Sequence, residues 1–149
     1  MKHCITFIFL SFSTVFFAQQ TDYNTKKGAV ASGYDVVAYF SNQVKKGSKK
    51  FTIKHDGVAF CFSSEKNLKL FKENPDKYIP QYGGYCAYAV AERNKKMYTH
   101  PEFYEIRDGK LYLFYNPWIG SALEDWQEGD VKKRQEKGDT NWKNLQHKK

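Results

Sequence analysis

The chain has few residues of the kinds that build disulfide frameworks and metal clusters. Among its 149 residues are three cysteines, two methionines and four histidines. It contains no paired CxxC, no HExxH, no phosphate-cradling glycine loop and no Ser-His-Asp order. These absences argue against a hydrolase, a nucleotide-dependent enzyme and a thioredoxin-like oxidoreductase, and they favour a role other than enzymatic turnover.

Long apolar runs are also lacking, apart from one short run at the N-terminus. Residues 5–17 are almost wholly apolar, follow a basic start at Lys2, and end at Ala18 before a polar segment. A secretory signal peptide has these parts in this order, whereas a membrane span needs about 20 apolar residues. We therefore predict a signal peptide over residues 1–18 and an exported protein, periplasmic or extracellular, without a transmembrane span after cleavage. The alternative is an uncleaved N-terminal anchor.

The rest of the chain is long enough for one domain of common size. Its composition, 41% hydrophobic and 17% aromatic, permits a core, and no internal repeat is apparent. We predict a flexible lead-in over residues 19–32, one domain over 33–128 and a basic tail over 129–149. The net charge of +8 comes largely from that tail. A solvated chain end is the favoured interpretation, and export argues against nucleic acid as a partner.

Two segments carry the pattern of a β-hairpin. Residues 51–62 alternate around a His-Asp-Gly turn, which places Phe60 and Phe62 on one face and Cys61 on the other. Residues 103–115 contain Asp108-Gly109, a strong turn signal, and residues 111–114 are apolar on both faces, which favours a central strand. Short helices are expected after Ser64, Cys86 and Ser121. The predicted fold class is α+β: a small antiparallel sheet, or two hairpins, with short helices packed on it.

Several segments, taken together, resemble the YHS domain family. They are GYDVVAYF (33–40), KGS (46–48), the G-x-x-F-x-F-S-S-x-x-N pattern (57–67), LFKENPDKYIPQYGGYCAYAVA (70–91) and DGKLYLFYN (108–116). The resemblance covers most of residues 33–126 and is closest to the exported, single-domain branch. It implies a YHS-like α+β fold and a link to copper and heavy-metal transport. Where some metal-binding relatives carry cysteines after the strand, this chain has Ser63 and Lys66, so the resemblance implies no thiolate zinc site.

Cys86 is the main candidate for a functional side chain. It falls on a family cysteine position, follows Gly83-Gly84, and begins a predicted helix whose free N–H groups favour a thiolate. The alternative is a buried, inert cysteine. A disulfide with Cys61 would stabilise the fold by roughly 3–4 kcal/mol and would remove both the metal-binding and the nucleophilic roles.

His100 is the most plausible second ligand, and Met97 lies three residues before it. A set of Cys, His and Met suits a soft ion such as Cu(I). Asp35 is expected to cap a helix or to act as a hard ligand, and Tyr34 and Tyr85 to line a pocket or the core. We predict binding of copper or zinc for sequestration or delivery. Two alternatives stay open: a thiol-redox protein that uses Cys86, and a module that binds a small apolar or aromatic molecule in a tyrosine-lined pocket.

Overall fold

The computed structural model describes residues 22–116 and 120–148, and the structural statements below refer to those residues. The predicted signal peptide lies outside them. The helices and strands are, in chain order, η1 (Val30–Gly33), η2 (Ala38–Ser41), β1 (Ser48–His55), β2 (Val58–Phe62), α1 (Glu65–Glu73), α2 (Pro75–Tyr78), η3 (Gln81–Gly84), α3 (Ala87–Arg93), β3 (His100–Arg107), β4 (Lys110–Phe114), α4 (Ala122–Gln127) and α5 (Val131–Leu145).

The α+β prediction is confirmed, with two separate antiparallel hairpins rather than one sheet. β1 pairs with β2, and β3 pairs with β4. Each turn contains an Asp-Gly pair with positive φ, at Asp56-Gly57 and Asp108-Gly109, as two-residue hairpin turns require. Val58, Phe60 and Phe62 are buried while Cys61 is half-buried on the opposite face, which confirms the predicted alternation.

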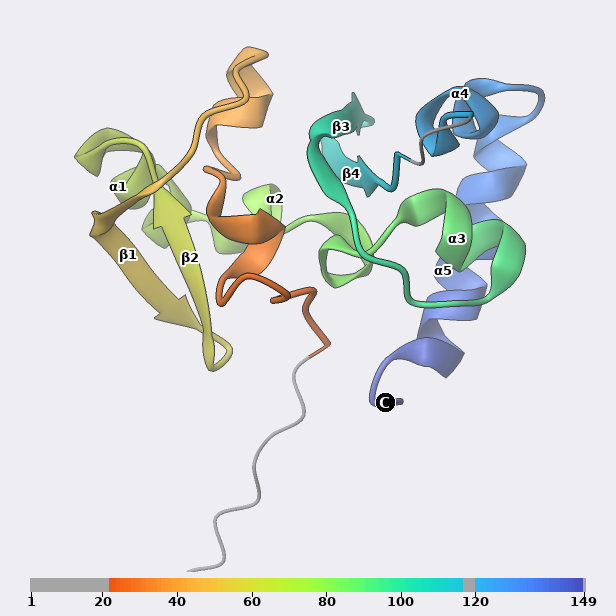
Figure 1. Cartoon of the computed structure of the whole chain (residues 1–149), viewed down its shortest axis with the longest axis horizontal. Helices are drawn as coiled ribbons and strands as arrows, with labels where there is room; N and C mark the ends of the chain where they lie inside the picture. The colour runs from red at the N-terminus through yellow and green to blue at the C-terminus, as the bar shows by residue number, and fades with distance from the viewer. Residues whose placement is uncertain (1–21, 117–119, 149) are drawn as a thin grey trace, which may run out of the picture.

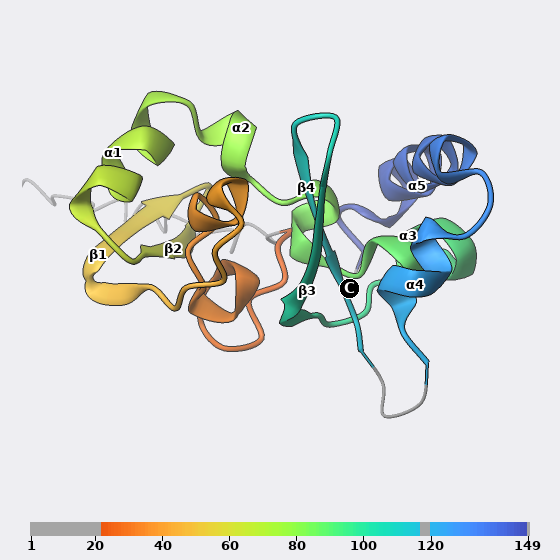
Figure 2. The same ribbon diagram turned by 90° about the horizontal axis from the view of Figure 1, so that it is seen from above.

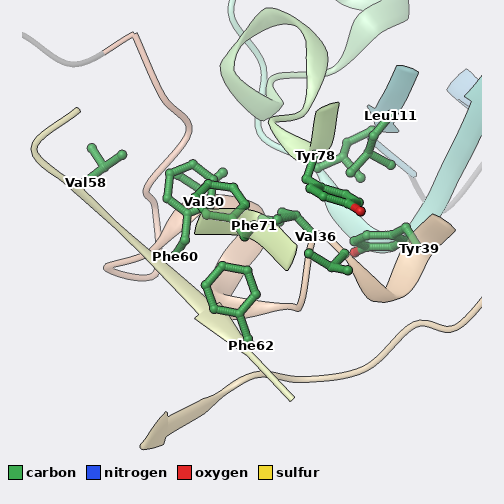
Figure 3. Packing of buried hydrophobic residues seen from close by; sticks show 12 residues of the cluster. Val30, Val36, Tyr39, Val58, Phe60, Phe62, Phe71, Tyr78 and Leu111 are labelled. Atoms are coloured by element: carbon green, nitrogen blue, oxygen red, sulfur yellow. The ribbon is translucent and has the colours of Figure 1, made fainter. Parts of the chain in front are cut away.

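Strand β4 lies between the β1–β2 hairpin and helices α3, α4 and α5 (Figures 1 and 2), and it contributes to two hydrophobic cores. Its side chains alternate, so Leu111 and Leu113 belong to the core under β2 and α1, whereas Tyr112 and Phe114 belong to the core under α3 and α4. Figure 3 shows the first core, in which Phe71 of α1 packs between Phe60 and Phe62 of β2. The second core is built around Trp126, which is fully buried. This double burial explains why residues 111–114 are apolar on both faces.

Both ends of the described chain are part of the fold. In the predicted lead-in, Asn24 and Val30 are buried, and the Asn24 N–H donates to the Gly83 carbonyl at 2.8 Å. The predicted basic tail contains helix α5, which packs along α3 (Figure 1). Asn141 of α5 donates its amide to the Val90 and Ala91 carbonyls near the end of α3, at 2.9 Å each. Side-chain hydrogen bonds to buried backbone therefore hold α5 in place, although its surface is basic.

Two segments of the chain, from η1 to α1 and from η3 to α4, repeat one backbone arrangement. We call them the first half and the second half. Residues 31–33 have φ values of 52°, 55° and 81°, and residues 82–84 have values of 54°, 61° and 81°. In each half a tyrosine N–H closes the turn, from Tyr34 to the Ala31 carbonyl and from Tyr85 to the Tyr82 carbonyl. Positive φ is uncommon for residues other than glycine. Three successive residues with positive φ, of which Ala31, Ser32 and Tyr82 are not glycine, at two places 51 positions apart therefore indicate a structural repeat.

The hairpins repeat as well, at a spacing of 52 residues. The β1–β2 ladder is irregular between Ser48 and Thr52, and the β3–β4 ladder is irregular between His100 and Tyr104, at the same point relative to the turn. The sequence analysis missed this repeat because few matched positions keep the same residue. Those that do include Gly33 and Gly84, Tyr34 and Tyr85, Ala38 and Ala89, Asn42 and Asn94, and the two Asp-Gly turns.

None of the helices in the described ranges is long and apolar enough to cross a membrane.

Candidate functional site

Asp35 lies at the centre of the first half, and its carboxylate is held by five donors. The backbone N–H groups of Val37 and Ala38 donate to Oδ1 at 3.0 and 3.2 Å. The N–H and hydroxyl of Ser63 and the side-chain amide of Asn67 donate to Oδ2 at 2.7, 2.6 and 2.7 Å. Asp35 is completely buried, and its lone pairs are filled by the protein. It therefore joins the η2 turn to the start of α1 and has no free oxygen for a metal ion.

Cys86 occupies the position in the second half that matches Asp35. The N–H groups of Tyr88, Ala89 and Tyr115 lower the pKa of its thiol, and these residues match Val37, Ala38 and Ser63. The Cys86 N–H donates to the Met97 carbonyl at 2.9 Å, as the Asp35 N–H donates to the Lys45 carbonyl at 2.8 Å. The three donors around the sulfur are thus the backbone part of a carboxylate site. No counterpart of the Ser63 hydroxyl or the Asn67 amide reaches the sulfur among the described residues.

The Cys86 thiol is buried, with 1% of the residue exposed. Burial raises the pKa of the thiol, and the three N–H groups and the Arg93 guanidinium lower it only in part. The thiol is therefore protonated in the free protein at neutral pH. Cys61 is a free, half-buried cysteine on β2, and its sulfur accepts a hydrogen bond from the Thr52 hydroxyl at 3.5 Å. The two cysteines form no disulfide in the structure.

A cavity of about 300 Å³ adjoins Cys86; we call it the sulfur cavity. The residues that matter for its chemistry are Cys86, Arg93, Met97, Tyr115, Ser121 and Asp125. It therefore has a thiol and a thioether in its wall, with one basic and one acidic side chain. In the first half, β2 is followed after two residues by α1, and Ser63 and Asn67 close the site around Asp35.

His100 lies outside the sulfur cavity. It lines a second cleft, which shares Met97 and Tyr115 with that cavity, and its ring packs 5.4 Å from the Tyr115 ring. The Asn116 N–H donates to His100 Nδ1 at 3.0 Å, so the neutral imidazole carries its proton on Nε2. A metal-ligating histidine normally donates from the nitrogen that does not bind the metal. To bind a metal through Nε2, His100 would have to give up its bond to Asn116.

The remaining candidates have structural roles in the second cleft and the core. The Tyr34 hydroxyl donates to Glu102 at 3.3 Å, and the charge of Glu102, with some burial, raises the Tyr34 pKa. The Tyr85 hydroxyl donates to the Tyr23 carbonyl at 3.4 Å, and its ring packs 6.2 Å from that of Trp142. Tyr34 and His100 thus share one cleft, whereas Tyr85 does not take part in either site.

Sequence reasoning did not single out Tyr115, Arg93 or Ser121 as site residues. Tyr115 and Arg93 act through a backbone N–H and a long-range charge, which no motif encodes. The sequence did contain one usable signal, the pair of Asp-Gly turns. Aligning the two hairpins on these turns matches Tyr115 to Ser63 and would have placed the Tyr115 N–H beside Cys86. No three His, Cys, Asp or Glu side chains of the described ranges group as a metal site.

Comparisons of the chain with protein-family models, with curated proteins and with solved structures give no match.

Proposed function

We propose that this is an exported protein that binds one soft metal ion, Cu(I) in preference to Zn²⁺, between Cys86 and Met97. The observation that carries the proposal is that a thiol and a thioether line one cavity. Cu(I) selects thiolate and thioether sulfur and accepts few ligands, whereas zinc is held by four ligands in structural sites and three in catalytic ones. The resemblance to the YHS family, which remains a prediction, supports the same choice of ion.

The donors around Cys86 fit this role. The N–H groups of Tyr88, Ala89 and Tyr115 lower the pKa of the thiol, so they favour the thiolate once a cation displaces the proton. In the free protein, burial keeps that proton in place, and a protonated thiol reacts slowly with oxidants and disulfides. The buried, protonated thiol therefore favours a role for Cys86 as a metal ligand over a role as a rapidly reacting redox thiol. The role that follows is sequestration or delivery of the ion rather than turnover.

The test is a Cu(I) titration of the chain from residue 19 onward, kept reduced and anaerobic, in competition with a chromophoric Cu(I) chelator. We expect one bound ion. Cys86→Ser, whose hydroxyl can accept from the same donors, should weaken Cu(I) binding at least about 100-fold, and Met97→Leu about tenfold. Cys61→Ser is the matched control and should bind as the wild type does. Unchanged binding in Cys86→Ser would remove the proposal.

A second readout follows from the proton that the metal must displace. Since a protonated thiol has to ionise on binding, Cu(I) affinity should fall as the pH is lowered, and binding should release a proton. Affinity that does not change with pH between about 6 and 8 would show that the ion binds without Cys86, whose pKa lies above this range.

A further inference from the structure

The second cleft lies where the two halves of the chain meet; we call it the seam cleft. It has a volume of about 560 Å³. The residues on which the inference depends are Asn24, Lys26, Lys27, Tyr98, His100 and Tyr115. Asn24 and the two lysines come from the segment before η1, and the other three flank or belong to β3 and β4. Clefts between structural units are frequent places for small ligands.

Asn24 supplies a hydrogen-bond acceptor on the cleft wall. Only 4% of Asn24 is exposed. Its side-chain amide donates to the Gly84 carbonyl at 3.0 Å and to the Thr99 hydroxyl at 3.2 Å, which uses both of its N–H bonds and fixes the orientation of the group. Its Oδ1 accepts no hydrogen bond from residues 22–116 or 120–148. Since no fully enclosed side-chain oxygen of the described residues lacks a partner, Oδ1 is not fully enclosed and can accept from a ligand that brings an O–H or N–H donor.

The basic groups of the seam cleft are hydrogen-bond donors. His100 carries its ring proton on Nε2, because Nδ1 accepts from Asn116. Lys26 and Lys27 bring two positive charges. Lys96, which also lines the cleft, is paired with Asp22 at 3.5 Å. The acidic side chain in the wall is Glu102, which accepts from Tyr34. Lys26 and Lys27, which form no ion pair with residues 22–116 or 120–148, and an imidazole N–H favour an anion, and a carboxylate matches them in charge and in acceptor number.

The apolar wall is aromatic. Tyr115 packs against His100, and Tyr98 is 51% exposed, with the Lys26 ammonium 4.2 Å from its ring centroid. An exposed aromatic ring beside a cation provides a flat contact surface for another ring. We propose that the seam cleft binds a small hydroxylated aromatic carboxylate. The carboxylate contacts Lys26, Lys27 and His100, the ring lies against Tyr98 and Tyr115, and the hydroxyl donates to Asn24 Oδ1.

This proposal is independent of metal binding, since none of these groups is a ligand in the sulfur cavity. The two sites share Met97 and Tyr115 as wall residues. Measurements on metal-free protein therefore test the seam cleft alone. Cys86→Ser, which should weaken Cu(I) binding, should leave ligand binding in the seam cleft unchanged.

The experiment is isothermal titration calorimetry of the metal-free chain from residue 19 with 4-hydroxybenzoate. We expect saturable binding of one molecule. Benzoate, which lacks the hydroxyl donor, should bind about fivefold more weakly, and tyramine, which carries a cation on a similar ring, at least about tenfold more weakly. No saturable binding of 4-hydroxybenzoate up to about 10 mM, or equal binding of tyramine, would overturn the proposal.

Two variants locate the site. Lys26→Gln combined with Lys27→Gln should weaken 4-hydroxybenzoate binding about tenfold, and His100→Phe, which keeps a ring against Tyr115, about fivefold. The matched control is Lys54→Gln, an exposed lysine on β1, which should bind as the wild type does. Thermal melting confirms that each variant is folded. Equal 4-hydroxybenzoate binding by the double lysine variant, His100→Phe and Lys54→Gln would place the ligand elsewhere and overturn the assignment.

Discussion

Asp35 and Cys86 occupy matching positions in the two halves of the chain, and they differ in how completely the protein satisfies them. Backbone N–H groups from the following turn and from the end of a hairpin surround both side chains. Around Asp35, Ser63 and Asn67 complete the set, and no space remains. Around Cys86, no side chain from the described part of the chain takes their place, and a cavity is found instead. The same arrangement of backbone N–H groups thus holds a structural carboxylate in the first half and belongs to a candidate binding site in the second.

The largest effect is expected from removing the Asp35 carboxylate. Asp35→Ala leaves five donors without their acceptor in a fully buried place. The free energy of unfolding should fall by about 3 kcal/mol or more, measured by urea denaturation. Asp76→Ala, at an exposed aspartate in the first turn of α2, is the control and should change it by less than about 1 kcal/mol. Similar losses for the two variants would contradict the structural role of Asp35.

Placing a carboxylate at position 86 tests whether positions 35 and 86 are equivalent. Cys86→Asp should lower the free energy of unfolding by less than about 1.5 kcal/mol at pH 8, because the three N–H groups accept an anion there. Ala91→Asp, at a fully buried position of α3, should lower it by about 4 kcal/mol, since it places a charged carboxylate in the core. Equal destabilisation by Cys86→Asp and Ala91→Asp would show that the N–H groups around position 86 do not stabilise a carboxylate as those around Asp35 do.

Helix α5 lies beyond the repeated part of the chain, and its close approach to η3 can be tested separately. A Cβ at Gly138 would lie 2.5 Å from the Tyr82 hydroxyl oxygen. Gly138→Ala gains about 1 kcal/mol of helix propensity but should still destabilise the fold by about 1 kcal/mol, because overpacking opposes it. Thr140→Ala, at an exposed position of the same helix, should be neutral or slightly stabilising. A more stable Gly138→Ala protein would show that α5 can move away from Tyr82 at little cost.

The smallest effect concerns Glu105, which stands where the first half has Ile53. Burial opposes its ionisation, but hydrogen bonds from Arg107, Gln127 and Trp126 outweigh burial and hold the Glu105 pKa below its ordinary value. A lowered pKa stabilises the fold above the unfolded value of 4.5, and that contribution is lost as the pH falls through the lower folded value. Glu105→Gln should therefore cost about 1 kcal/mol at pH 7, and the difference from wild type should shrink towards pH 3. A difference that stays constant with pH would exclude the charge as its cause.

The sequence predicts the local elements of this fold well and its long-range relations poorly. Alternating side chains and Asp-Gly turns were enough to find both hairpins, and Ser64 and Ser121 cap α1 and α4 as expected. The repeat was missed because it is preserved in φ angles and hydrogen bonds rather than in residue types. Cys86 could be selected from the sequence, but its backbone donors could not, because any residue can supply an N–H. His100 and Cys86 are close in sequence, yet the path of β3 brings His100 into the seam cleft instead.

The most direct test of the central claim is X-ray absorption at the copper edge of the Cu(I)-loaded chain, compared with Cys86→Ser and Met97→Leu. The account predicts two sulfur neighbours in the wild type and the loss of one in Met97→Leu. In Cys86→Ser it predicts loss of the ion or of the short thiolate contact. A spectrum with only nitrogen and oxygen neighbours, or one that neither substitution changes, would contradict it.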